Sequence, residues 1–153
     1  MLRHGLTAGL LCLVLVGCTG TVEVTPPEPA KPVKDACLRL QQQLPDRVAG
    51  EDRREAEPRS KLTAAWGDPE ITLRCGVGKP RAYTKTSQLF TVNGVAWLPV
   101  PPGAEIPTAF YAVERTAYIE LTVPEEQQPA ADALVDLGKA IKATVPKDPD
   151  AGP

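Results

Sequence analysis

Residues 89–98 read Leu89-Phe-Thr-Val-Asn93-Gly94-Val-Ala-Trp-Leu98. An Asn-Gly pair between two β-prone runs is the preferred two-residue hairpin loop, because both residues tolerate a positive φ. The register that this loop sets pairs Val92 with Val95 and Phe90 with Trp97 on one face. We therefore predict an antiparallel hairpin, and we favour a core position for Trp97 over a role as a ligand platform.

Alternating apolar side chains extend the sheet on both sides of this hairpin. Ile71, Leu73 and Cys75 alternate with polar or small residues, as in a strand with one buried face. Residues 117–123 alternate in the same way until Pro124 ends the run. The sequence predicts about five strands, over residues 71–77, 89–92, 95–98, 110–113 and 117–123.

Two segments with helical spacing flank these strands. Asp35 is a good N-cap for a helix from residue 36 to about residue 44, where Pro45 stops it. In residues 131–145 the apolar side chains form one stripe, with Asp132 early and lysines late, as the helix dipole favours. We expect an α+β fold, in which an antiparallel sheet of about five strands carries an N-terminal and a C-terminal helix on one face.

The N-terminus has the pattern of a lipoprotein signal peptide. A basic residue, Arg3, precedes an apolar run over residues 6–16, which ends in Gly17-Cys18. The run has 11 residues, whereas a helix that crosses a bilayer needs about 20. We expect residues 1–17 to be removed and the Cys18 thiol to carry acyl chains, which would anchor the protein to the outer face of the cytoplasmic membrane.

Cys37 and Cys75 are the cysteines that remain outside the leader and the lipidation site. In an oxidising compartment a disulfide is their default state. Zinc ligation is the alternative, but the only histidine is His4 in the leader, and the chain has no C-x-x-C. Cys37 falls on the inner side of the first helix and Cys75 on the apolar side of a strand, so we predict that a disulfide joins helix to sheet.

The remaining segments suggest a simple domain organisation. Residues 18–34 contain the lipidated cysteine and four prolines, which predicts an extended tether, either a spacer of defined reach or a featureless linker. A single domain is expected over residues 35–146. Residues 147–153 are polar and rich in Pro and Gly, as in a disordered tail.

Composition excludes several classes of function. Without residues 1–17 the chain has 16 basic and 19 acidic side chains, and no basic stripe is interleaved with aromatic residues, so we expect no nucleic-acid partner. Without histidine it cannot build a Ser-His-Asp or Cys-His site, nor the usual zinc sites. We expect no cofactor and no metal.

A carboxylate-dependent glycan hydrolase is still conceivable. It would need two carboxylates about 5 Å apart, or about 6.5 to 9.5 Å apart for inversion. The candidates are Asp68, Glu70, Glu114 and Glu120. No pattern in the sequence brings any two of them together, and solvated surface carboxylates are the favoured interpretation.

Four residues form a candidate binding surface: Trp66, Asp68, Arg74 and Arg115. A Trp-Gly-Asp-Pro turn beside an arginine could bind a carboxylate, a phosphate or a sugar stacked on the indole. In the structural interpretation, which we favour, Trp66 fills the end of the core and Asp68 caps the turn and pairs with Arg74. Arg74 alternates onto the face opposite Cys75, so we expect it to point outward.

The strings Ala64-Ala-Trp-Gly-Asp-Pro69 and Leu73-Arg-Cys-Gly-Val77 carry a family resemblance, supported by Asn93-Gly-Val-Ala-Trp97 and by Arg115 ahead of a strand that ends in Val123-Pro124. Together they resemble an actinobacterial lipoprotein family called domain of unknown function 3515. The resemblance covers most of residues 36–145. It implies an actinobacterial source and a location in the cell envelope, and it implies no activity.

We therefore expect an extracytoplasmic lipoprotein that binds an envelope protein or a cell-wall component without catalysis. A small glycan hydrolase and a structural accessory subunit of a membrane complex are the alternatives. An exposed apolar patch would favour a protein partner. A deep polar cleft that holds a carboxylate of raised pKa would favour the enzyme.

Overall fold

The computed structural model of the protein describes residues 20–150 and residue 152. The predicted signal peptide and lipidation site at Cys18 lie outside the described residues. No helix among these residues combines the length and the apolarity that crossing a bilayer requires. In chain order the elements are β1 (Val22–Glu23), α1 (Lys31–Gln41), β2 (Arg47–Val48), β3 (Glu51–Arg54), β4 (Ala56–Glu57), β5 (Thr63–Trp66), β6 (Ile71–Val77), β7 (Phe90–Val92), β8 (Val95–Val100), β9 (Ala109–Val113), β10 (Tyr118–Thr122), the 3-10 helix η1 (Glu125–Gln127) and α2 (Ala131–Thr144).

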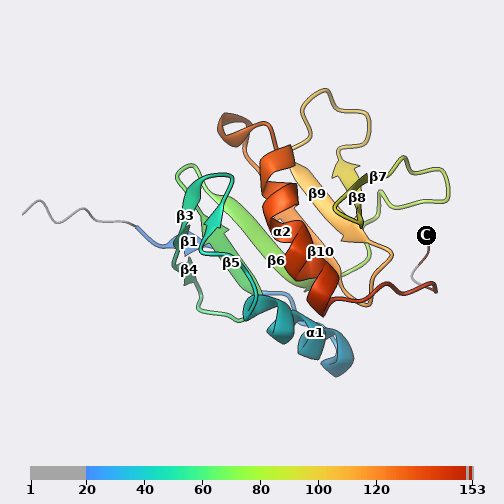
Figure 1. Ribbon diagram of the computed structural model, residues 1–153, viewed down its shortest axis with the longest axis horizontal. Helices are drawn as coiled ribbons and strands as arrows, with labels where there is room; N and C mark the ends of the chain where they lie inside the picture. Colours follow the sequence, from blue (N-terminus) through green and yellow to red (C-terminus); the bar gives the residue numbers. More distant parts are fainter. Residues whose placement is uncertain (1–19, 151, 153) are drawn as a thin grey trace, which may run out of the picture.

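The main sheet has eight strands in the order β2-β3-β5-β6-β10-β9-β8-β7, and every neighbouring pair is antiparallel. Figure 1 shows α2 running across the front of the sheet, with α1 beside its lower end. The expected α+β class is therefore confirmed. The expected number of about five strands is wrong, because β2, β3 and β5 extend the sheet beyond β6.

The extra strands lack the alternation that marks a half-buried strand. All four residues of β3 are charged, and none is fully buried. All four residues of β5 are buried, because β5 is covered on both faces. A strand with two covered faces, or a strand made of charged residues only, has no period-two apolar pattern to detect.

The N-terminal segment covers the second face of β5. β1 pairs in parallel with β4, and Val22 and Val24, which are 3% and 4% exposed, pack against Ala65. The expected tether over residues 18–34 is thus wrong for residues 20–30, which belong to the folded body. The first helix also begins at Lys31 rather than at residue 36, with Pro32 in its first turn, where a missing N–H costs nothing.

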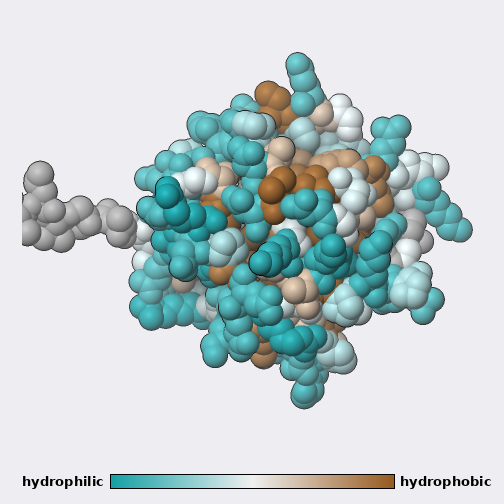
Figure 2. All heavy atoms as spheres, in the orientation of Figure 1, coloured by the Kyte–Doolittle hydropathy of each residue, from teal (hydrophilic) through white to brown (hydrophobic). Residues whose placement is uncertain are grey.

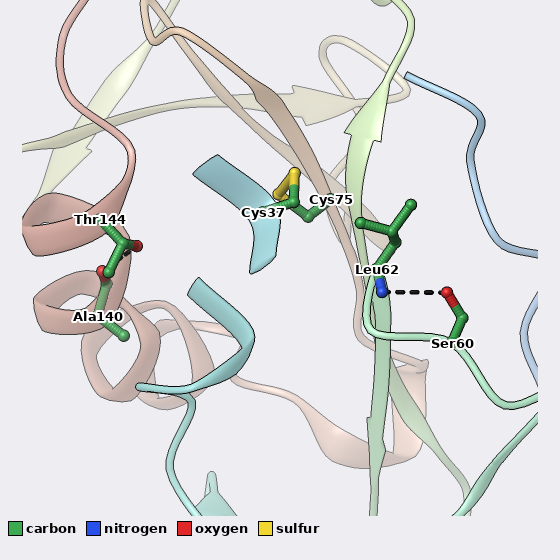
Figure 3. Close-up of a disulfide and its surroundings, with 6 residues drawn as sticks. All are labelled: Cys37, Ser60, Leu62, Cys75, Ala140 and Thr144. Atoms are coloured by element: carbon green, nitrogen blue, oxygen red, sulfur yellow. Dashed lines mark hydrogen bonds between the residues drawn. A yellow bond between two sulfur atoms is a disulfide. The ribbon is translucent and has the colours of Figure 1, made fainter. Parts of the chain in front are cut away.

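The predicted disulfide is confirmed. Cys37 of α1 and Cys75 of β6 are bonded, with their Cα atoms 5.6 Å apart, and both side chains are buried. Figure 3 shows the bridge between the helix and the sheet. It fixes α1 onto the face of the sheet that also carries α2.

The predicted hairpin is also confirmed. β7 and β8 pair Val92 with Val95 and Phe90 with Trp97, and Asn93 and Gly94 both have positive φ. The Trp97 side chain is fully buried, so its position in the core is confirmed. Asn93 at the hairpin tip donates from Nδ2 to the Val135 carbonyl oxygen of α2 at 3.2 Å.

The C-terminal segment continues into the fold after α2. The Thr116 amide donates to the Pro146 carbonyl oxygen, and the Asp148 amide donates to the Glu114 carbonyl oxygen, each at 3.1 Å. The backbones of Lys147 and Arg115 form an isolated antiparallel β-bridge. The expected disordered tail is therefore wrong for residues 147 and 148, which pair with the turn between β9 and β10.

Candidate functional site

Trp66, the first of the four predicted binding residues, is a core residue. Its side chain is fully buried, and its Nε1 donates to the Pro45 carbonyl oxygen at 3.1 Å. The Arg53 guanidinium lies over the indole, 4.7 Å from the ring centroid, and burial lowers the pKa of Arg53. With its donor used and its ring covered, the indole has no surface for a ligand.

Asp68 lies in the turn between β5 and β6, and its side chain is 85% exposed. Its nearest cation is Arg54, with Nη1 3.9 Å from Oδ1. The Arg54 Nη1 also donates to the Gly67 carbonyl oxygen at 2.9 Å. The expected pair between Asp68 and Arg74 is therefore wrong, since Arg54 supports this turn.

Arg74 faces away from the helices and belongs to a row of side chains across three strands. Glu120 of β10 is directly opposite Arg74 of β6 and Tyr111 of β9. The Arg74 Nη1 donates to Glu120 Oε1 at 3.0 Å, and the Tyr111 hydroxyl donates to Glu120 Oε2. Both oxygens of the Glu120 carboxylate thus accept hydrogen bonds, and the row connects the three central strands β6, β10 and β9 through their side chains.

The environment of Tyr111 favours the protonated phenol. Burial first, and then the hydrogen bond to Glu120 and its charge, raise the pKa of Tyr111 to about 12. A phenol with this pKa does not release its proton near neutral pH. The row is therefore suited to structural support or to a hydrogen-bonding contact rather than to proton transfer.

Arg115 is buried and points into the domain instead of out of it. Its side chain is 3% exposed, and it donates to the carbonyl oxygens of Val145 at 2.6 Å and Gly94 at 2.8 Å. Burial lowers the pKa of Arg115. This guanidinium connects three segments, so Arg115 cannot join Trp66, Asp68 or Arg74 in one binding surface.

The candidate carboxylates of a hydrolase lie at three different levels along the strands of the sheet. Asp68 and Glu70 precede β6, whereas Glu114 follows β9 at the other end of the antiparallel strands. The seven residues of β6 separate these two ends by about 20 Å. Glu120 sits between them and is already paired. The spacing that a two-carboxylate glycosidase needs is therefore not formed between Glu114 and the turn before β6.

The most distinctive surface feature is apolar. Three large apolar side chains are exposed among the described residues: Phe90 at 37%, Val135 at 47% and Ile106 at 51%. Phe90 of β7 stacks edge-on against the buried Phe110, and Val135 lies on the neighbouring helix α2. Figure 2 shows brown spheres gathered where α2 lies beside β7 and β9. Phe90 and Val135 lie on elements that contact each other, and we call these two residues the apolar patch.

Charged side chains of α2 border the apolar patch. Lys139 and Lys142, both exposed, line a shallow hollow together with Asn93 at the hairpin tip. Apolar side chains surrounded by polar and charged groups are typical of contact surfaces for other proteins. Asp132 and Asp136 are also exposed on α2, so charges of both signs border the apolar patch.

The sequence contains one signal for this surface, on α2. Val135 lies off the buried stripe of α2, among Asp132, Asp136 and Lys139. An apolar residue on the polar face of an amphipathic helix is such a signal. Phe90 pairs with the buried Trp97, but β7 is the outermost strand, so its helix-facing side is only partly covered.

Other sites for chemistry are sparse in the described part of the chain. One hollow lies between residues 82–88 and 98–103, and its lining includes Thr84, Thr86 and Ser87 but no ionisable side chain. Ser87 Oγ donates to the Ala82 carbonyl oxygen at 3.0 Å. Within residues 20–150 and 152, no group of three His, Cys, Asp or Glu side chains is placed to hold a metal ion.

A family model described as "Protein of unknown function (DUF3515)" matches residues 14–150. No curated protein and no solved structure matches the chain.

Proposed function

We propose that this chain, which belongs to the DUF3515 family of proteins of unknown function, is a lipid-anchored domain on the outer face of the cytoplasmic membrane. In this proposal it binds another envelope protein through the apolar patch and catalyses no reaction. An actinobacterial source is part of the same proposal and is supported by the sequence resemblance.

Two features support the location. The Gly17-Cys18 pattern after an apolar run is typical of a lipoprotein signal. The bonded pair Cys37–Cys75 favours an oxidising compartment, because disulfides rarely persist in the cytoplasm.

The exposed apolar patch is the observation that carries the binding proposal. Phe90 and Val135 keep 37% and 47% of their surface exposed, on neighbouring elements of the fold. Burying such surface in a complex stabilises it by roughly 25 cal/mol for each Å² of apolar area removed from water. The paired Glu120 and the distant Asp68 and Glu114 give no comparable support to the hydrolase.

Site-specific photo-crosslinking in native membranes tests this proposal. A photoreactive phenylalanine analogue replaces Phe90 in one variant and Thr91 in the other. Thr91 is the matched control, because it is exposed on the same strand but alternates onto the other face. We expect one discrete protein adduct from position 90, none from position 91, and loss of the adduct when Val135→Asp is added.

Equal adducts from both positions, or an adduct that survives Val135→Asp, would contradict binding through the apolar patch. A cell-wall ligand would give a different result, namely sedimentation with isolated wall material and no protein adduct. Turnover of wall glycan that Glu120→Gln or Asp68→Asn abolishes, with the fold intact, would instead support the hydrolase.

A further inference from the structure

The chain is held by the folded body from its first described residue. The Gly20 carbonyl oxygen accepts a hydrogen bond from Arg54 Nη2. The amides of Val22 and Val24 donate to the carbonyl oxygens of Glu55 at 2.9 Å and Glu57 at 2.8 Å. Because the side chains of Val22 and Val24 are also buried, residues 20–24 have no freedom to act as a spacer.

The proline-containing segment that follows is held as well. Arg74 Nε donates to the Thr25 carbonyl oxygen at 2.9 Å. Pro29 lies so close to β6 that a Cβ built on Gly76 would be only 2.7 Å from Pro29 Cγ. The segment from Gly20 to α1 is therefore laid along the body and adds no reach between the domain and an anchor.

Only Thr19 separates Gly20 from Cys18. Two residues of extended chain span at most about 7 Å. The polar headgroup layer on each side of a bilayer is of similar thickness, about 5 to 7.5 Å, since the hydrocarbon is about 30 Å of a total of about 40 to 45 Å. Acyl chains on Cys18 must enter the hydrocarbon, so Gly20 has to lie at the outer surface of the headgroups.

We propose that the domain sits directly on the phospholipid headgroups through the edge around Gly20, which we call the anchor edge. This inference rests on the proposed lipidation of Cys18. The anchor edge is formed by the residues that line the hollow at Gly20, namely Asp52, Arg53, Arg54, Glu55, Gly67 and Asp68.

The charges of the anchor edge are mixed. Arg47, with 66% of its side chain exposed, pairs with Asp52 at 3.1 Å, and the exposed Arg59 pairs with Glu55. Together with Asp68 near Arg54, these pairs leave no basic cluster, which is the feature that attracts anionic lipid. The short connection to the acyl chains keeps the anchor edge at the membrane surface. Zwitterionic headgroups are therefore sufficient for this contact, and anionic lipid is not required.

This seating gives the domain a defined orientation. Six strand spacings separate β3 from β7 in the sheet order, which corresponds to about 29 Å. Figure 1 shows the described segment before β1 at one end of the long axis and the loop between β6 and β7 at the other. The edge strand β7, which carries Phe90, is thereby presented away from the membrane.

Paramagnetic relaxation in bilayer nanodiscs tests the orientation. The full lipidated chain is inserted into phosphatidylcholine nanodiscs that contain a lipid with a gadolinium-chelate headgroup, and mass spectrometry verifies the lipid on residue 18. We expect strong relaxation enhancement of the amides of Asp52 and Glu55 and none at Lys85 and Gln88. The same pattern is expected when part of the lipid is phosphatidylglycerol.

A spacer variant provides the control for the length of the connection. About twelve Gly/Ser residues inserted between Thr19 and Gly20 add about 20 Å of flexible reach and should abolish the contrast between Asp52 and Lys85. The same insertion after Gly103, in an exposed loop with free space around it, should leave the contrast unchanged.

Three results would overturn the contact between the anchor edge and the headgroups while leaving the lipid anchor in place. They are equal relaxation enhancement at Asp52 and Lys85, a contrast that requires phosphatidylglycerol, and a contrast that survives the N-terminal spacer. An unmodified Cys18 in membrane-bound protein would overturn the proposed anchoring and the seating together. The mass of residue 18 thus separates the two failures.

Discussion

Arg115 donates a 2.8 Å hydrogen bond to the carbonyl oxygen of Gly94, which joins the turn after β9 to the tip of the β7–β8 hairpin. The same guanidinium reaches the Val145 carbonyl oxygen at the end of α2. One side chain thereby connects three segments that are distant in sequence.

Replacing the Arg115 guanidinium should destabilise the folded protein. We expect Arg115→Met to lower the free energy of unfolding by about 3 kcal/mol, because hydrogen bonds from a charged donor contribute about 1.5 to 3 kcal/mol each. Urea denaturation measures the loss. Arg81→Met, at an exposed arginine, is the matched control and should change stability by less than about 0.5 kcal/mol. Equal effects of the two substitutions would show that the buried arginine is not a structural connector.

The disulfide should contribute a large share of the stability of the domain. Cys37 and Cys75 are 38 residues apart. In the chain-entropy model, closing such a loop raises the free energy of the unfolded state by about 4 kcal/mol. We expect the double variant Cys37→Ala/Cys75→Ala to lose about this amount. Reductant should destabilise the wild type and leave the double variant unchanged, and a similar response of both proteins would contradict the prediction.

Tyr111 should make stability depend on pH in the alkaline range. Its pKa is raised from 10.0 to about 12 in the folded state, so the folded protein retains a proton that the unfolded chain releases. The resulting stabilisation is complete below about pH 10 and is lost as the pH rises through 12. We expect the free energy of unfolding to fall more steeply between pH 10 and pH 12 in the wild type than in Tyr111→Phe.

Tyr83 and Tyr118 also have raised pKa values, mainly through burial, and both remain in the Tyr111→Phe variant. Subtracting the phenolate absorbance of the variant from that of the wild type therefore isolates Tyr111. A difference curve centred near the ordinary value of 10 would contradict the burial of this phenol together with its hydrogen bond to Glu120.

Gly138 should resist the substitution that usually stabilises a helix. Glycine inside a helix normally costs about 1 kcal/mol relative to alanine. A Cβ at Gly138, however, would lie 2.9 Å from the Asn93 Cβ of the hairpin tip, and overpacking of this kind costs about 1 to 3 kcal/mol. We expect Gly138→Ala to be neutral or destabilising, and the added change Asn93→Gly to restore stability. A gain of about 1 kcal/mol from Gly138→Ala alone would refute this contact.

The N-terminal strand should contribute to the stability of the whole domain. Val22 is 3% exposed and Val135 is 47% exposed, so the same substitution can be compared at both sites. We expect Val22→Ala to cost about 2 kcal/mol and Val135→Ala to be within about 0.5 kcal/mol of the wild type. If both substitutions had equal, small effects on thermal or urea unfolding, residues 20–24 would behave as the free tether that the sequence predicts.

The sequence was informative wherever local chemistry determines the structure. Asn93-Gly94 sets the hairpin and its register, and the alternation in β6 and β10 follows from one buried face. β1 was missed because four prolines in residues 18–34 favour an extended linker, whereas the pairing with β4 depends on contacts with residues more than thirty positions away.

The candidate site was less accessible to prediction than the fold. Alternation places Arg74 and Glu120 on the outward face, but their pairing requires the register between β6 and β10, which no local pattern supplies. Trp66 and Arg115 resemble binding residues because such residue types are common in binding sites. Their burial depends on β3 and on the C-terminal segment, and neither could be placed from the sequence.

The two outermost strands of the sheet are short: β2 has two residues and β7 has three. A short edge offers few free backbone groups to a second sheet, so copies of the domain gain little by joining edge to edge. For molecules confined to a membrane surface, as we propose, neighbours meet often and at high effective concentration. Contacts at β7 then depend on the side chain of Phe90 and not on its backbone, so they are selective for a partner that fits this side chain. Copies of the domain that have no partner can therefore stay monomeric on a crowded membrane surface.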